Sequence, residues 1–507
     1  MQLHDGPARK WWTLAAVCVA TFMLLIDITI VNVALPDIRS ALGSSFSDLQ
    51  WVIDAYALTL AAFLLTWGST SDRLGRRLIF VVGLVIFVCA SLACALATSP
   101  LFLNLARAVQ GVGAAAMFAT SLALLASAFH GRERGTAVGI WGATIGAAVA
   151  IGPLVGGLLT ESVGWESIFY INVPIGLGAI YIALTRVAES KDPDAGPTDW
   201  AGLVTFSGGL FLLIFALVRG NPEGWGSPLI VSFLVGAAVL LAAFIVVEAR
   251  VAHPMFDLAL FRVPTFGGAS IAAFALSASL FSMFLYLTLY IQNSLGYSPL
   301  EAGLRFLPLS LLSFFVAPLA GRLSARVPIR ALIGGGMLLV TVSLLLMRGL
   351  NASSDWTALL AGFCLAGIGT AFVNPSLAST AVSVVPPQRA GMGSGINSTF
   401  RQIGIATGTA GLGALFQGLL ADRATGRLAH VPAEVLAQGR PEVAGPGGRE
   451  AYLTLFTGAL NDLFLIAAII AFAGAVLSFA LIRGRDFIAS GPAVEEESEP
   501  EAEAAAA

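Results

Sequence analysis

The sequence predicts an all-α membrane protein that crosses the bilayer many times. Of its 507 residues, 57% are hydrophobic and only 11% are charged, whereas soluble domains carry about 25% charged residues. The apolar residues gather in fourteen runs, and a helix needs about 20 such residues to span the hydrocarbon core. The basic residues fall mainly on one side of these runs, which also gives the chain a predicted orientation.

Each apolar run is expected to form one membrane-spanning helix. Hydrocarbon offers no partners for backbone N–H and C=O groups, so a chain that crosses it must satisfy them within a helix. Short polar turns such as Ser99-Pro100 separate most of the runs. The predicted spans are 12–35, 49–69, 78–98, 101–125, 136–160, 168–187, 199–218, 228–247, 265–291, 301–320, 330–348, 356–380, 390–418 and 453–482.

The positions of Lys and Arg orient these spans, because both residues favour cytoplasmic loops. With the N-terminus placed in the cytoplasm, seventeen basic residues fall in inside segments and seven in outside segments. Four of those seven belong to one long outside loop. We therefore expect both termini to be cytoplasmic, which also requires an even number of spans.

An internal repeat divides the chain into two bundles. Residues 68–77 (GSTSDRLGRR) and 321–330 (GRLSARVPIR) share one Gly and two Arg at equal offsets, 253 residues apart, and both are inside loops. Internal repeats are typical of transporters whose binding site lies between the halves. The expected layout is a cytoplasmic N-terminus (1–11), a six-helix bundle (12–187), a linker with two inserted helices (188–264) and a second six-helix bundle (265–482).

Two polar segments interrupt this layout. The outside loop 419–451 is rich in Pro and Gly, and is either a solvated connector or a mobile flap. The tail 483–507 holds six acidic residues between Glu495 and Glu503, and its low complexity predicts disorder.

The residue inventory disfavours an ATP-driven pump and an enzyme. The only lysines, Lys10 and Lys191, do not follow a glycine, so the chain has no P-loop Gly-Lys pair. The four cysteines lie in apolar runs, and the four histidines are scattered without metal-site or nucleophile–base spacing. We expect no cofactor, no metal, no ATP and no nucleic-acid partner, with a proton gradient as the energy source.

Five ordered motifs resemble the major facilitator superfamily, and specifically its 14-span drug:proton antiporter branch of the EmrB/QacA type. The resemblance extends from about Trp12 to Arg483. The motifs are residues 25–36 (LIDITIVNVALP), 68–77 (GSTSDRLGRR), 103–115 (LNLARAVQGVGAA), 152–157 (GPLVGG) and 168–176 (IFYINVPIG). The resemblance implies two six-helix bundles with two additional inserted helices, no enzymatic activity, and export across the cytoplasmic membrane.

Ionisable residues within spans are the candidates for proton coupling. An Asp or Arg at mid-bilayer costs about 2.5–3.5 kcal/mol on insertion scales, so such residues are usually functional. Asp27, Asp54 and Arg107 all fall in the outer halves of their predicted spans. We hypothesise that Asp27 accepts the proton and that Arg107 sets its proton affinity. The alternatives are a fixed structural ion pair for Asp27 and a place in the outer vestibule for Asp54.

Two motifs have a mechanical interpretation. Small residues permit close helix approach, and a proline frees a backbone carbonyl. The resemblance implies a cytoplasmic gate that latches the outward-open state, with positive-inside anchoring of the arginines as the alternative. It also implies a conformational hinge in the fifth span, with generic small-residue packing as the alternative. The gate residues are Gly68, Asp72, Arg73, Gly75, Arg76 and Arg77, and the hinge residues are Gly152, Pro153, Gly156 and Gly157.

Aromatic and polar side chains in the second half are candidates for a substrate pocket, because aromatic rings suit bulky lipophilic ligands. Any of them could instead face lipid or core. The candidates are Phe281, Phe284, Tyr286, Tyr290, Asn374, Arg401 and Gln402. The spans of the second half carry no mid-membrane carboxylate, which predicts neutral, monocationic or zwitterionic substrates rather than dications.

These features together predict a proton-coupled multidrug exporter of the inner membrane. Its expected partners are small lipophilic substrates, protons and membrane lipids, and we expect a monomer. A dedicated exporter of one metabolite, antibiotic or lipid shares every motif. A channel or a membrane-embedded enzyme is less favoured, since no pore-lining charge ring and no catalytic constellation is visible.

Overall fold

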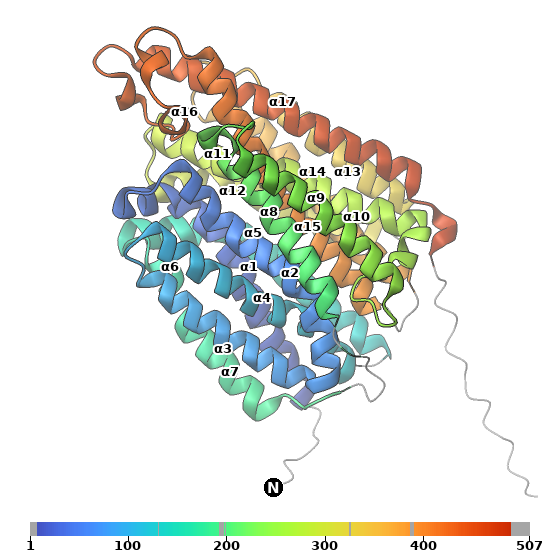
Figure 1. The fold of residues 1–507 in the computed structure, drawn as a ribbon. Coiled ribbons are helices and arrows are strands. Elements are labelled where there is room, and N and C mark those ends of the chain that lie inside the picture. Colours follow the sequence, from blue (N-terminus) through green and yellow to red (C-terminus); the bar gives the residue numbers. More distant parts are fainter. Residues whose placement is uncertain are drawn as a thin grey trace, which may run out of the picture.

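The computed structural model describes residues 8–487 except 130, 192–196, 198, 324–325 and 386–389. Within these ranges the chain is helical and has no strand, as the sequence predicts (Figure 1). Thirteen helices of the described part are long and apolar enough to cross a membrane. A further long helix, α5 (Gly131–Ser162), coincides with the predicted fifth span but is not one of those thirteen. Most of the acidic tail, 488–507, lies outside the described residues.

The first half of the chain forms one bundle, in the lower part of Figure 1. Ser45 and Asp48 form a reciprocal capping box that begins α2, and Ser99 caps the start of α4. The predicted sixth span consists of two helical segments that join at Ile171, whose backbone dihedrals are also helical, and it forms one apolar stretch, Ser167–Arg186. The helices of this N-half are α1 (Ala8–Leu42), α2 (Phe46–Leu74), α3 (Arg76–Ala95), α4 (Pro100–Ala128), α5, α6 (Ser167–Tyr170) and α7 (Asn172–Arg186).

The second bundle, which we call the C-half, lies above the first in Figure 1. Its first span is irregular, because two π-helical turns interrupt the α-helix, and such turns are frequent at functional sites. This span comprises α10 (Pro264–Leu276), η2 (Ser277–Phe281), α11 (Met283–Leu289) and η3 (Tyr290–Ser294). The remaining long helices are α12 (Pro299–Leu323), α13 (Ile329–Met347), α14 (Thr357–Ser383), α15 (Ala390–Arg423) and α17 (Arg449–Leu481).

The inserted helices α8 (Trp200–Glu223) and α9 (Pro228–Arg250) occupy the side of the molecule where the halves meet. Helix α8 packs against α2 of the N-half and α15 of the C-half, and α9 packs on α8. The Asn221 side chain of α8 donates a hydrogen bond to the Ala414 carbonyl of α15, at 2.6 Å. The insertion therefore contacts both halves.

The two halves also contact each other directly through α5 with α12 and α2 with α15. At the predicted extracytoplasmic end, Glu161 accepts a hydrogen bond from the Ser298 hydroxyl at 2.6 Å. The Gln292 amide donates to the Val33 carbonyl at 2.7 Å, again from one half to the other. These contacts close the interface at that end.

In the region of the predicted long loop, α15 continues to Arg423 and α17 begins at Arg449. Its short helices η5 (Gly426–His430), α16 (Ala433–Leu436) and η6 (Pro441–Ala444) lie over the predicted extracytoplasmic end. Gln438 is buried, accepts a hydrogen bond from Arg39 of the N-half and, through its carbonyl, one from Asn293 of the C-half. The loop is therefore packed onto both halves in this structure.

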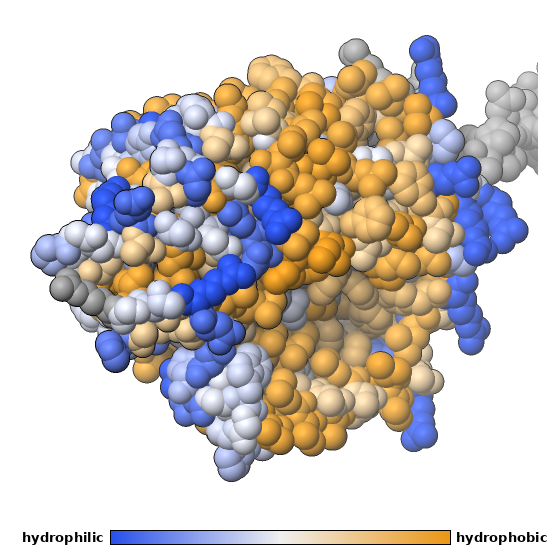
Figure 2. All heavy atoms as spheres, turned by 90° about the horizontal axis from the view of Figure 1, so that it is seen from above, coloured by the Kyte–Doolittle hydropathy of each residue, from blue (hydrophilic) through white to orange (hydrophobic). Residues whose placement is uncertain are grey.

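The surface matches the solvent that the sequence predicts. Figure 2 shows a broad hydrophobic belt between one polar end and a second, thinner rim of charged residues. Large apolar side chains of the long helices are exposed, among them Phe315 of α12 and Val204 of α8 at 69% and 65%. Such a surface would be unstable in water and is stable in lipid.

Candidate functional site

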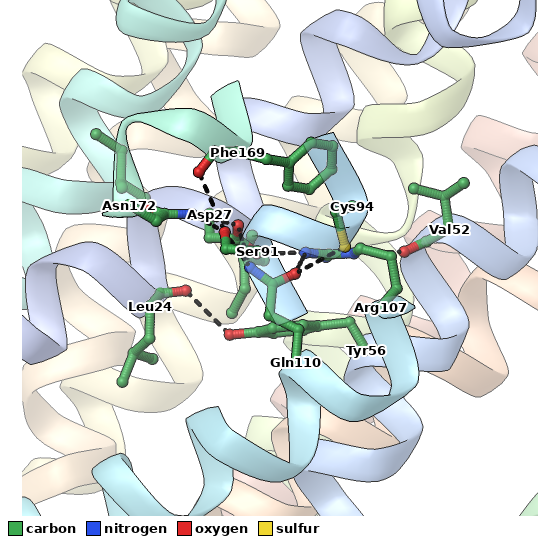
Figure 3. Close-up of polar contacts among 12 residues, drawn as sticks. Leu24, Asp27, Val52, Tyr56, Ser91, Cys94, Arg107, Gln110, Phe169 and Asn172 are labelled. Atoms are coloured by element: carbon green, nitrogen blue, oxygen red, sulfur yellow. Dashed lines mark hydrogen bonds and ion pairs between the residues drawn. The ribbon is translucent and has the colours of Figure 1, made fainter. Parts of the chain in front are cut away.

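The centre of the N-half holds a buried ion pair. Asp27 of α1 and Arg107 of α4 contact each other directly and have side-chain exposures of 0% and 2%. The sequence singles out both residues by their cost in the membrane, and the structure brings them together (Figure 3). An ion pair this far from water is retained only when its remaining hydrogen-bonding atoms are also satisfied.

Two neutral side chains complete the partners of Asp27, and a third, Ser91, binds both of them. The Oδ1 atom of Asp27 accepts hydrogen bonds from the amides of Gln110 (2.9 Å) and Asn172 (3.0 Å). The same two amides donate to Ser91 Oγ, at 3.0 and 2.8 Å. Ser91 in turn donates to the Phe169 carbonyl at 3.2 Å, so the network joins α1, α3, α4, α6 and α7.

Arg107 is held by groups other than Asp27 as well. Its Nε donates to the Val52 carbonyl at 3.1 Å, and an Nη1 donates to Gln110 Oε1 at 2.6 Å. Its Cζ lies 4.3 Å from the centre of the Tyr56 ring, a distance that gives a cation–π interaction. The Tyr56 hydroxyl donates to the Leu24 carbonyl at 3.2 Å, which fixes the ring.

A cavity of about 10 Å³, room for about one water molecule, lies between the halves against this network. Arg107 and Tyr56 form part of its wall from the N-half, and Gln402 and Ile405 of α15 form the wall from the C-half. The rest of the lining is apolar, from Ile28, Val31, Ile53 and Ala57. One guanidinium therefore touches both the buried carboxylate and the space between the two bundles.

Asp54 does not join the Asp27 network. It is fully buried on α2, and neither carboxyl oxygen accepts a hydrogen bond from any described residue. Its electrostatic neighbour across the interface is the neutral phenol of Tyr286 on α11. Burial of a carboxylate without a partner is costly, so Asp54 is a second unusual acid on the face that packs against the C-half.

Most of the predicted pocket residues do not line the cavity. Tyr286 donates a hydrogen bond to the Thr409 carbonyl at 2.8 Å, and Tyr290 to the Ser354 carbonyl at 3.3 Å, and both are fully buried. Phe281 and Phe284 pack on each other with ring centres 6.0 Å apart. Asn374 is on α14, away from the lining. Only Gln402 lies in the wall, and Arg401 precedes it.

The predicted gate residues cluster with a partner that the sequence does not reveal. Asp72 and Arg76 form an ion pair at 2.9 Å, whereas Arg73 is exposed. The Glu189 carboxylate accepts hydrogen bonds from the backbone N–H groups of Arg77 (3.0 Å) and Leu78 (3.1 Å) at the start of α3. A helix N-terminus favours such a carboxylate.

Gly75 is the turn residue between α2 and α3. Its φ of +128° favours glycine, and a β-carbon there would meet the Glu189 carboxylate at 2.7 Å. Gly68, by contrast, has open space around it. Among the described residues, Asp72 pairs with Arg76 of the N-half, and Arg77 contacts Val187 and Glu189, which follow α7 at the start of the linker.

Replacing Asp72 by Asn removes the charge that the gate hypothesis needs. We expect a shift of up to about fivefold toward the inward-open state, since a partly exposed pair contributes about 0–1 kcal/mol. Spin labels at the predicted cytoplasmic ends of α3 and α13 would report the ratio of the two states as a distribution of distances between the labels. Glu223→Gln, which breaks the similarly spaced Arg219–Glu223 pair on α8, is the matched control. Identical distributions for Asp72→Asn and the control would exclude the latch.

The fifth-span glycines bring helix backbones into contact. Gly156 lies against Ile30 of α1, where a β-carbon would be 2.9 Å from the Ile30 carbonyl oxygen. Gly157 lies against Pro299 and Leu300 of α12. Gly152 faces Thr29 of α1, and the carbonyl of Pro153 faces Gly303 of α12. The motif is thus the site where α5 meets one helix of each half.

Comparison with known proteins identifies the class. The model of the Major Facilitator Superfamily matches residues 17–409, and the chain belongs to this superfamily of multi-pass membrane transporters. A bacterial homologue of the human lysosomal transporter Spinster has a similar fold, with a TM-score of 0.64 at 18% identity over 95% of this chain and 98% of that one.

Several relatives in sequence are named for drug resistance or export. Multidrug resistance protein Stp of Mycobacterium tuberculosis is 37% identical, over 80% of this chain and 75% of its own. The tetracenomycin C resistance and export protein of Streptomyces glaucescens is 35% identical, over 83% and 81%. The puromycin resistance protein of Streptomyces alboniger is 36% identical, over 85% and 88%.

Proposed function

We propose that this protein is a proton-coupled antiporter that exports small lipophilic compounds across the cytoplasmic membrane by alternating access. In this proposal it is a monomer in contact with membrane lipids, has fourteen spans with α5 as the fifth, and has both termini in the cytoplasm. The observation that carries the proposal is the contact of Arg107 with both the buried Asp27 carboxylate and the cavity between the halves.

The mechanism follows from competition for one guanidinium. With Asp27 ionised, Arg107 is paired and the network is neutral. A proton that reaches Asp27 weakens this pair, and Arg107 is then free to shift between the network and the cavity wall. Occupation of the cavity by a substrate and protonation of Asp27 therefore oppose each other through Arg107, which is the coupling that antiport requires. Asp54 is a second candidate proton carrier on the same interface.

The packing of α5 supports the proposed alternating access, in which the N-half and the C-half move relative to each other. Gly156 and Gly157 let α5 touch α1 and α12 almost backbone to backbone. The contact of Gly157 can adjust little without moving a whole helix, because the atoms nearest to it are backbone atoms of Pro299 and Leu300. We propose that the residues Gly152 to Gly157 are the pivot on which the halves rock, and that the Asp72 loop latches the opposite end.

A dedicated exporter of one antibiotic is the second candidate function. Its support is that some relatives are named for single compounds, tetracenomycin C and puromycin. Everted membrane vesicles that contain the protein, loaded with protons by respiration, would separate the two functions. Uptake of several unrelated lipophilic dyes and drugs, abolished by an uncoupler, supports the broad exporter. Uptake of one compound from the panel supports the dedicated one, and uptake that the uncoupler leaves unchanged would refute proton coupling.

A further inference from the structure

Arg401 is a second arginine deep within the bundle, and nothing in the proposed mechanism uses it. It lies eleven residues inside α15, which begins at Ala390. It is surrounded by protein, yet its side chain is partly accessible rather than closed off. A cation placed within a membrane span is costly and usually marks a site.

The surroundings of Arg401 differ from those of Arg107. Arg107 has an ion pair, two hydrogen bonds and an aromatic ring. For Arg401 no described residue provides an ion pair or a hydrogen bond, and no acidic side chain interacts with it. Asp27 is already paired, and Asp54 has no electrostatic interaction with Arg401. The protein thus leaves five N–H donors and one positive charge of Arg401 without an internal acceptor.

Helix geometry places Arg401 beside the cavity. Residues four apart share one face of a helix, and side chains lean toward the helix N-terminus. Ile405, four residues after Arg401, lines the cavity, and so does the adjacent Gln402. Arg401 therefore lies one turn from the lining, on its predicted cytoplasmic side, where a compound entering from the cytoplasm would meet it.

We propose that Arg401 binds an acidic group of the exported compound, a carboxylate or an ionised phenol, and that this sets the substrate class. A guanidinium matches a carboxylate with two parallel hydrogen bonds. The cavity is too small in this structure for such a compound, so the apolar wall of Ile28, Val31 and Ile53, with the Tyr56 ring, would receive the lipophilic body only when the halves move apart. The Asp27–Arg107 pair is neutral as a whole, so an anion meets no net repulsion from it.

The proposal rests on the proposed export function and narrows it. The sequence alone predicts neutral, monocationic or zwitterionic substrates over dications. An unpaired cation beside the cavity also disfavours dicationic substrates. In addition, it favours lipophilic anions as substrates. Among zwitterions, the recognised end is the acid.

The test compares one fluorescent aromatic carboxylic acid with its methyl ester. Everted vesicles carrying wild type, Arg401→Gln or Arg401→Lys would be assayed for proton-driven uptake of each compound. We expect Arg401→Gln to lower uptake of the acid about ten- to a hundredfold, the range of a lost charge-assisted hydrogen bond. Uptake of the ester should change less than about twofold, and Arg401→Lys should restore part of the acid uptake.

Two controls keep the outcomes distinct. Arg305→Gln removes another arginine of the C-half, which lies 3.3 Å over the Tyr297 ring away from the cavity, and should leave the acid-to-ester ratio unchanged. Equilibrium binding of the acid to the purified full-length protein should weaken in Arg401→Gln by the same factor as uptake. Equal loss of acid and ester in Arg401→Gln, or an unchanged ratio, would overturn the role of Arg401. Wild-type vesicles that take up neither compound, nor any member of the drug panel, would instead overturn the export function.

Discussion

Replacing Asp27 by Asn is expected to abolish proton-driven export. The amide oxygen of the new side chain can still accept the hydrogen bonds from Gln110 and Asn172. An amide cannot be protonated as a carboxylate can, so protonation can no longer release Arg107. The substitution also leaves Arg107 as a buried charge without its counter-ion, a loss of about 3–5 kcal/mol. We expect uptake into everted vesicles to fall about a hundredfold or more, and to stop responding to a change in the pH gradient.

Two variants separate proton coupling from folding. Asp462→Asn removes a carboxylate that pairs with Arg423 near the surface, and should retain export. The double variant Asp27→Asn with Arg107→Gln removes both buried charges together, so it should recover thermal stability in detergent without recovering proton-driven uptake. Full proton-coupled export by Asp27→Asn alone would contradict the proposed carrier.

Replacing Gly157 by Leu is expected to force the predicted extracytoplasmic ends of α5 and α12 apart. A β-carbon at residue 157 would lie 2.5 Å from the Pro299 carbonyl oxygen and 2.6 Å from the Leu300 Cα. Both neighbours are backbone atoms, which cannot rotate away. Overpacking costs about 1–3 kcal/mol, enough to change the ratio of the two conformations by about five- to a hundredfold.

Pulsed electron paramagnetic resonance would measure this shift. Spin labels at Val163 and Ser353, both exposed near that end, should show a longer distance in Gly157→Leu than in wild type. Gly178→Leu is the matched control, because nothing lies within 4 Å of the position that its β-carbon would take on α7. Export should fall in Gly157→Leu alone. An unchanged distance with normal export would mean that this contact does not control the closed end.

The sequence anticipates the helices well because their driving force is local. A run of about 20 apolar residues must span the hydrocarbon wherever it lies in the chain. The exceptions are features that depend on neighbours, such as the junction of two helical segments at Ile171 and the π-helical turns at Ser277–Phe281 and Tyr290–Ser294. The docking of Gln438 onto both halves is another, since Pro- and Gly-rich composition does not reveal burial.

The residues of the candidate site also fall into two groups: those that the sequence alone singles out and those whose role depends on how the helices pack. Asp27 and Arg107 stand out by the cost of a charge in lipid. Gln110 and Asn172 lie within recognised motifs, but their convergence on Asp27 depends on how α1, α4 and α7 pack. Tyr56 gives no signal, because a tyrosine in a span can face lipid, core or cavity. The same ambiguity applies to Tyr286 and Tyr290, whose hydroxyls bond to backbone carbonyls in this structure.

The opposite charges of Asp27 and Arg107 cancel in the ion pair. Under the proposed function, this buried network is electrically neutral until a proton reaches Asp27. Once Asp27 is protonated, the guanidinium is a net positive charge, and the membrane voltage acts on it. A full crossing of one charge is worth about 2.3 kcal/mol per 100 mV. Under the proposed function, a negative cell interior draws the protonated carrier inward and favours the departure of an anion, whereas it opposes the departure of a cation. Voltage alone, without any difference in pH, should then sustain export of acidic compounds.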